Sequence, residues 1–119
     1  MAGLESRDFT APDETRTPDK TTVELVNMAG GQIGRYTFQP GWKWSECIKP
    51  VVGTDSCQVE HIGYVISGRM KVVMDSGEES EVGPGDTFHM PSGHDAWTVG
   101  DEPCVVVDFG RIEGHAKRG

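Results

Sequence analysis

Two histidines and a cysteine are the residues of this chain best suited to chemistry: His61, His94 and Cys57. Imidazole and thiolate groups bind zinc, and they also bind copper, nickel and iron. Because thiolate is a soft ligand, the set favours zinc among the divalent transition metals. The three residues do not form a short local motif such as paired CxxC repeats, so they make a metal site only if the fold brings them together.

Strand geometry decides whether these side chains converge, because alternate residues of a strand share one face. If residues 57–67 are extended, Cys57 and His61 lie on the same face and Tyr64 lies on the other. Four residues of extended chain span about 13 Å, so the thiol contacts the imidazole only if the chain bends before His61. With that bend, a thiolate–imidazole nucleophile is an alternative use of the pair.

Aromatic side chains provide a second group of candidate site residues. Three tryptophans are a high number for a chain of 119 residues: Trp42, Trp44 and Trp97. The sequence "WKW" would place two of their indole rings on one strand face. Such rings line ligand pockets, fill the core or form dimer contacts, and all three uses stay open. Tyr36 and Tyr64 are two further sources of a hydroxyl group for a pocket, and the sequence leaves open which way each side chain points. His89 is a further candidate for the pocket because small twists alter strand phase, although a surface position is favoured.

Short strand patterns dominate the elements that must position these residues. Eight or nine apolar or alternating segments are bounded by Gly, Pro or Asp, and no apolar pattern with a 3.6-residue period is long enough for a helix. This pattern predicts an all-β sandwich or barrel. The segments read "TTVELVN", "QIGRYTFQP", "HIGYVIS", "RMKVVMD", "SEV", "TFHMP", "DAWTV" and "CVVVDF".

The chain divides into one domain and two polar ends. Residues 1–20 predict a flexible arm, or alternatively a strand that pairs with a neighbouring subunit. Residues 21–110 hold the strand signals and form the domain. Residues 111–119 are a polar tail in which His115 is expected to be solvated.

Charge and cysteine content limit the partners and the compartment. The formal net charge of −8 repels nucleic acid and anionic membranes, so we expect neither as a partner. The first twenty residues contain no apolar run, and no segment approaches the length of a membrane span. Three cysteines without a secretory signal indicate a reducing compartment, so we expect a cytoplasmic protein.

The run "HIGYVISGRMKVVMDSGEESEVGPGDTFHMPSGH" resembles a small single-domain bacterial cupin. The first motif of that superfamily ends with Glu, six residues and Gly, and His61 and Gly68 fit this spacing with His in place of Glu. The second motif has a Gly, five residues, Pro, any residue and Gly, which Gly85, Pro91 and Gly93 match. The resemblance covers roughly residues 22–110 and implies a double-stranded β-helix, the cupin or jelly-roll barrel.

The departures from the cupin pattern concern the metal ligands. The histidine expected after the second motif would stand at Ala96, whereas His94 lies two residues earlier on the same strand face. No His-x-His sequence occurs, and counting back from His61 puts Asp55 and Cys57 at its two places. Counting forward from Gly41 instead puts Cys47 and Lys49 at these places, so the segment between carries an insertion of about ten residues relative to the pattern. Because the His-x-His sequence is missing, the usual three-His-one-Glu set is absent.

The resemblance implies an inward-facing pocket that binds a small-molecule ligand, and a homodimer. We predict a metal-dependent enzyme that acts on a small polar molecule, with His61, His94 and Cys57 as candidate ligands. The alternatives are a metal-free binding or sensing module whose tryptophans surround the ligand, and a structural domain whose pocket has lost its use.

Overall fold

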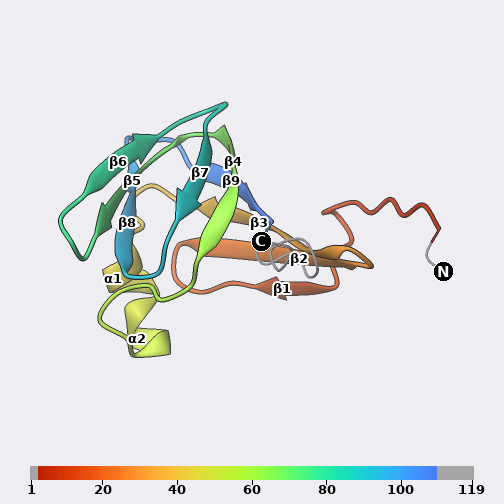
Figure 1. The fold of residues 1–119 in the computed structure, drawn as a ribbon, viewed down its shortest axis with the longest axis horizontal. Helices are drawn as coiled ribbons and strands as arrows, with labels where there is room; N and C mark the ends of the chain where they lie inside the picture. The colour runs from red at the N-terminus through yellow and green to blue at the C-terminus, as the bar shows by residue number, and fades with distance from the viewer. Residues whose placement is uncertain (1–2, 110–119) are drawn as a thin grey trace.

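Two antiparallel sheets packed face to face make up the protein in its computed structural model, which describes residues 3–109 (Figure 1). The predicted all-β class and the predicted number of strands are confirmed. The elements, in chain order, are β1 Glu14–Arg16, β2 Thr21–Met28, β3 Gly31–Phe38, α1 Trp44–Cys47, α2 Lys49–Val52, β4 His61–Ser67, β5 Arg69–Met74, β6 Glu79–Val82, β7 Thr87–Met90, β8 His94–Val99 and β9 Cys104–Asp108.

The sheets differ in size and enclose the core between them. The larger sheet has the order β1-β2-β3-β9-β4-β7, and the smaller has the order β6-β5-β8. Side chains alternate between core and surface along β4, where Gly63 and Val65 are buried while Tyr64 and Ile66 are exposed. This is the alternation that the sequence predicts for the strand. Val65 and Cys104 on the neighbouring strand are fully buried, which places the centre of the core against β4 and β9.

Gly68 joins the two sheets at the turn between β4 and β5. Its φ of +76° is a backbone conformation that favours glycine, and a Cβ atom there would lie 2.2 Å from the carbonyl oxygen of Pro103. A larger residue would therefore be strained both by its backbone and by the neighbouring chain. The structure gives a physical reason for a glycine at this position of the first cupin-like motif.

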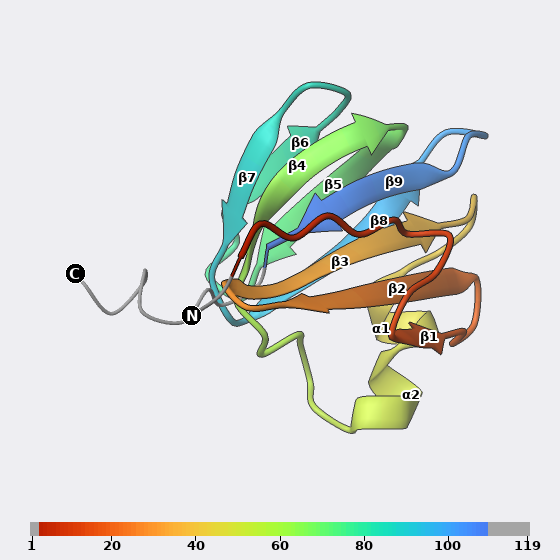
Figure 2. The ribbon, with the colours of Figure 1, turned by 90° about the vertical axis from the view of Figure 1, so that its right-hand side faces the viewer.

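Two one-turn helices, α1 and α2, interrupt the strand pattern between β3 and β4. They correct the expectation of a chain without helices and the placement of "WKW" on a strand, because Trp44 begins α1. A single turn is too short to show a 3.6-residue repeat in the sequence. Both helices lie together at one side of the sandwich (Figure 2), in the segment where the cupin pattern predicts an insertion.

The segment predicted as an arm contains a strand. Glu14–Arg16 pairs with β2 of the same chain, so the strand that the sequence allowed with a neighbouring subunit is made within the chain. The predicted tail and His115 lie outside the described residues. Among residues 3–109, no helix is long and apolar enough to cross a membrane.

Candidate metal centre and its cavity

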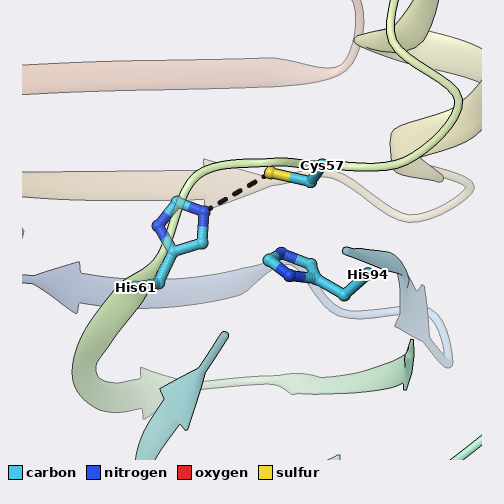
Figure 3. Close-up of side chains that lie close together, drawn as sticks. All are labelled: Cys57, His61 and His94. Atoms are coloured by element: carbon cyan, nitrogen blue, oxygen red, sulfur yellow. Dashed lines mark hydrogen bonds between the residues drawn. The ribbon is translucent and has the colours of Figure 1, made fainter. Parts of the chain in front are cut away.

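Cys57, His61 and His94 converge at one end of the sandwich (Figure 3). His61 is the first residue of β4, His94 is the first residue of β8, and Cys57 lies in the segment before β4. The Cys57 Sγ atom is 3.7 Å from His61 Nε2, and one ligand atom from each of the three residues lies within 4.8 Å of the others. The structure thus brings together the three residues that the sequence selected.

A bend between Cys57 and His61 makes this convergence possible. The backbone N–H of Cys57 donates to the His94 carbonyl oxygen at 2.7 Å, whereas β4 begins its pairing with β7 only at His61. The chain changes its pairing partner between these two residues, and Figure 3 shows it curving between Cys57 and His61 as it enters β4. The Cys57 thiol and the His61 imidazole therefore approach each other. The sequence predicted this contact only for a chain that bends before His61.

The Nδ1 atoms of both histidines are fixed by acceptors on the side away from the thiol. His61 Nδ1 donates to Asp108 Oδ2 at 2.5 Å, and His94 Nδ1 donates to the Pro91 carbonyl oxygen at 2.7 Å. A carbonyl oxygen only accepts, so the Nδ1 atom of His94 carries the proton and Nε2 holds the free lone pair in the neutral ring. Each histidine is thereby oriented to offer Nε2 as a ligand.

The second cupin-like motif positions His94. Gly93 has a φ of +91°, and its N–H donates to the Cys57 carbonyl oxygen at 2.7 Å. Pro91 supplies the carbonyl that holds the His94 ring. The turn therefore fixes both the backbone and the ring of His94, which explains how a histidine at this position reaches the site although the cupin pattern places one at Ala96.

Electrostatic coupling favours a charged pair in the metal-free site. Burial alone raises the pKa of the Cys57 thiol, but its interactions with the two histidines, first of all the hydrogen bond with His61, outweigh burial and lower that pKa to about 6. Burial also opposes the charged form of His61, yet its bonds to Asp108 and Cys57 raise its pKa to about 9. Between these values the thiolate faces an imidazolium.

Tyr36 on β3 adds a protonated hydroxyl group near the centre. Burial raises the pKa of Tyr36 to about 12, and the negative charges of Asp108 and Cys57 add to that effect. The hydroxyl is therefore a hydrogen-bond donor over the physiological pH range. The sequence offered Tyr36 as a possible hydroxyl without fixing its direction, and Asp108 was not among the candidate site residues. Asp108 carried a signal, because it follows Cys104 and Val106 in the inward phase of an otherwise apolar strand.

A cavity of about 540 Å³ opens beside the three ligand atoms. Most of the side chains around it are apolar or aromatic, and they come from both sheets and from the α1–α2 segment. The lining is formed by Arg16, Pro18, Thr21, Val23, Tyr36, Phe38, Trp42, Trp44, Ile48, Val51, Val52, Thr54, Cys57, Gln58, Val59, His61, Met70, Phe88, Met90, His94, Ala96, Val106 and Asp108.

The five residues predicted to line the pocket divide into two groups. Trp42 and Trp44 are buried and line the cavity. Tyr64 and His89 are exposed and lie outside it, because they occupy the outward phase of β4 and β7. Trp97 also lies outside, on the outward phase of β8, where the Lys43 ammonium is 5.3 Å from its ring centre.

Two further sequence positions are clarified by the structure. His89 Nε2 contacts Glu60 at 2.7 Å on the surface, in agreement with the surface position that the sequence favoured. Asp55, which the cupin pattern places at a ligand position, has a fully exposed side chain beside Lys49 and stands apart from the metal centre. The exposed loop at Asp55 begins before the chain turns inward at Ser56 and Cys57.

Comparison with known proteins agrees with this architecture. A model of the cupin domain family matches residues 34–110, which is well over half of the chain. The chain belongs to the cupin domain family. None of the curated proteins compared gives a significant match. The predicted cupin fold is therefore confirmed.

Solved structures with the same fold include both uncharacterised proteins and enzymes. A protein of unknown function from Rhizobium leguminosarum has a TM-score of 0.65 and 20% identity, covering 92% of this chain and 100% of its own. The polyketide cyclase RemF from Streptomyces resistomycificus has a TM-score of 0.61 and 20% identity, covering 93% and 82%. The oxalate decarboxylase OxdC of Bacillus subtilis has a TM-score of 0.62 and 17% identity, covering 94% and 31%.

Proposed function

We propose that this cupin is a metal-dependent enzyme that binds one divalent transition metal through Cys57, His61 and His94 and acts on a small molecule in the adjoining cavity. The observation that carries the proposal is the orientation of the two histidines. Each has its Nδ1 atom bound to an acceptor, which leaves Nε2 available beside a thiol of low pKa. Metal-binding histidines are commonly held in this way by a carboxylate or a backbone carbonyl.

The spacing of the ligand atoms fits a metal ion. Zinc–sulfur and zinc–nitrogen bonds of about 2.3 and 2.0 Å, at tetrahedral angles, separate neighbouring ligand atoms by roughly 3.5 Å. The distance of 3.7 Å from Cys57 Sγ to His61 Nε2 is close to this value, and His94 lies within the 4.8 Å limit of the group. Because 4.8 Å is the upper limit for the group, the His94 ring would need to move by at most about 1.3 Å to complete the set. The thiolate favours zinc over iron, nickel or copper.

Three protein ligands are the usual number in catalytic zinc sites, because a further position is then left for water or substrate. A metal bound here would supply Lewis-acid chemistry to an oxygen atom held in the cavity. The protein itself supplies Asp108, which orients His61, and the protonated Tyr36 hydroxyl, which donates to an oxygen anion. Two of the structural neighbours are enzymes by name, which supports a catalytic use of the fold. Homodimer formation and a cytoplasmic location stay predictions.

One observation favours a metal-free binding module as the alternative. Cys57 and His61 already contact each other, and the pKa of each is shifted towards a thiolate–imidazolium pair. The pair is thus electrostatically satisfied without an added cation. Such a module would hold its ligand in the cavity without changing it.

Metal content separates the two functions. Tag-free protein from metal-replete cells is expected to contain about one metal ion per chain by elemental analysis. Cys57→Ser and a His61→Ala, His94→Ala double variant are expected to lose it. Cys47→Ala and His89→Ala are the matched controls, since both lie outside the centre, and they are expected to retain the metal. The proposal would be contradicted if the folded wild-type protein contained no metal. It would also be contradicted if both the Cys57→Ser variant and the double histidine variant retained the metal.

Turnover is tested with the same proteins. A metabolite extract is incubated with metal-loaded wild type and with the double variant, and both mixtures are followed by mass spectrometry. Consumption of a compound by the wild type alone supports an enzyme. A compound that is retained by the folded wild type but never converted, with no other compound consumed, supports the binding module.

A further inference from the structure

A continuous row of aromatic rings forms one wall of the cavity. The Trp42 and Phe38 rings stack with centroids 4.1 Å apart and an interplanar angle of 28°. Phe38 and Tyr36 follow at 5.9 Å, and Tyr36 meets the edge of His61 at 6.4 Å. The row ends at the His61–His94 pair, whose ring centroids are 5.4 Å apart. All of these residues line the cavity, so the wall leads directly to the candidate metal ligands.

The opposite wall is apolar. Met70 on β5 and Ala96 on β8 face the row of rings from the smaller sheet, and Met90 on β7 lies at the same end as the histidines. Thioether groups pack well against the flat faces and edges of aromatic rings. A slot with a ring-lined wall on one side and methyl and thioether groups on the other suits a flat, apolar molecule.

Most polar groups of the cavity lining are already bonded within the protein. Thr21, Thr54 and Gln58 each donate to a backbone carbonyl. The Tyr36 hydroxyl and the Trp42 indole N–H, which is buried and has no partner among the described residues, remain as neutral donors to one oxygen-bearing group.

Apart from the histidines and Cys57, the lining residues with a formal charge are Arg16 and Asp108. Asp108 is bound to His61, and Arg16 is exposed and paired with Glu14. A molecule rich in hydroxyl groups would lose its hydration against this lining without gaining enough hydrogen bonds in return.

The entrance extends the apolar surface outwards. Val51, Val52 and Val59 line the cavity although they are 75%, 54% and 60% exposed. Exposed apolar side chains grouped at the rim of a pocket indicate a binding surface, because single soluble proteins rarely keep them together without a use. They belong to the α1–α2 segment and the chain that follows it, around the place where the motif spacing predicts an insertion.

We propose that the ligand of this cavity is a flat, ring-containing organic anion. Its body is apolar, and its one negatively charged oxygen-bearing group, such as a carboxylate, lies beside Cys57, His61 and His94. The inference deepens the proposed function and rests on it for the metal that would receive the oxygen. It replaces the sequence-based expectation of a small polar molecule. A volume of about 540 Å³ is in the range that holds molecules of several fused rings.

The test compares two probes by isothermal titration calorimetry on zinc-loaded protein. The probes are 2-naphthoate and gluconate, which carry the same charge and the same number of non-hydrogen atoms but differ in polarity and flatness. We expect 2-naphthoate to bind with one molecule per chain and at least about tenfold more tightly than gluconate, because its rings are removed from water. A smaller difference, or tighter gluconate binding, would overturn the inference.

Two variants locate the probe. Phe38→Leu removes a ring from the wall, and Phe9→Leu is its matched control, since Phe9 contacts Arg35 outside the cavity. Loss of one stacking partner is expected to weaken 2-naphthoate at least about threefold in the first variant and leave it within about twofold in the second. Should Phe38→Leu fail to fold, Ala96→Met, which fills the slot from the opposite wall, is expected to weaken the probe as well. Unchanged affinity in the folded wall variant would refute the placement.

Metal analysis of the same samples distinguishes this inference from the proposed function. Stoichiometric zinc without a preference for 2-naphthoate would overturn the ligand class and leave the metal site intact. A preference for 2-naphthoate that depends on Phe38, in protein that does not retain zinc, would contradict the metal-dependent enzyme and support the ligand class alone.

Discussion

The bond between His61 and Asp108 makes a quantitative prediction for the metal-free protein. Asp108 is buried and accepts from His61 Nδ1 at 2.5 Å, and this bond is a main reason for the raised pKa of His61. A change of that pKa from 6.5 to about 9 corresponds to about 3 kcal/mol of folding stability. Because Cys57 contributes to the shift, we expect Asp108→Asn to lose about 2 kcal/mol of this amount.

The loss should depend on pH with a definite sign. Because the pKa of His61 is higher in the folded state, its protonation stabilises that state fully at pH values below 6.5, the pKa in the unfolded chain. This stabilisation disappears as the pH rises through about 9, the pKa in the folded protein. The difference between wild type and Asp108→Asn should therefore be large near pH 6 and small near pH 10.

Urea denaturation of metal-stripped wild type and Asp108→Asn at these two pH values measures the difference. The chain offers a matched control in the surface pair of His89 and Glu60, whose atoms are 2.7 Å apart and whose side chains are 55% and 58% exposed. Glu60→Gln should change the free energy of unfolding by less than about 1 kcal/mol, because water screens the pair. An equally small effect of Asp108→Asn near pH 6, or an effect of the same size at both pH values, would refute the reasoning.

Three further predictions follow from the site and the core. In metal-free protein, the ultraviolet thiolate absorbance due to Cys57 should rise with a midpoint near pH 6 and be missing from Cys57→Ser, whereas a midpoint near 9 would contradict the coupling to the histidines. Gly68→Ala should cost about 3 kcal/mol or prevent folding, because its Cβ would meet Pro103, while Gly77→Ala, which has a φ of +97° and free space, should cost only about 1 kcal/mol by thermal unfolding. Val65→Ala should lose about 2 kcal/mol in urea denaturation, since the side chain is fully buried, and an effect below about 0.5 kcal/mol would show that the site is not tightly packed.

The alternation of residues along the strands and the spacing of Gly and Pro were sufficient to predict much of the fold and part of the metal centre. The alternation in β4 predicted that Tyr64 lies on the face opposite His61, Gly63 and Val65, and the structure has this alternation. The choice of Tyr64 as a pocket residue went against that alternation, and Tyr64 lies outside the cavity. The Gly and Pro spacing around Gly68 and Gly93 predicted the cupin turns, because their backbone conformations favour glycine. The one-turn helix α1 escaped prediction because it is shorter than one period of the pattern that reveals helices.

The sequence by itself determined which residue types are available for chemistry and which strand faces carry them. Only the tertiary structure decided that the chain bends between Cys57 and His61, since that bend depends on backbone pairing of Cys57 with His94, which is far away in sequence. It also decided that Asp108 orients His61. The apolar character of the cavity comes from both sheets and the α1–α2 segment together. Strand periodicity is a local property of the chain, whereas a metal centre and a cavity are made by contacts between distant segments.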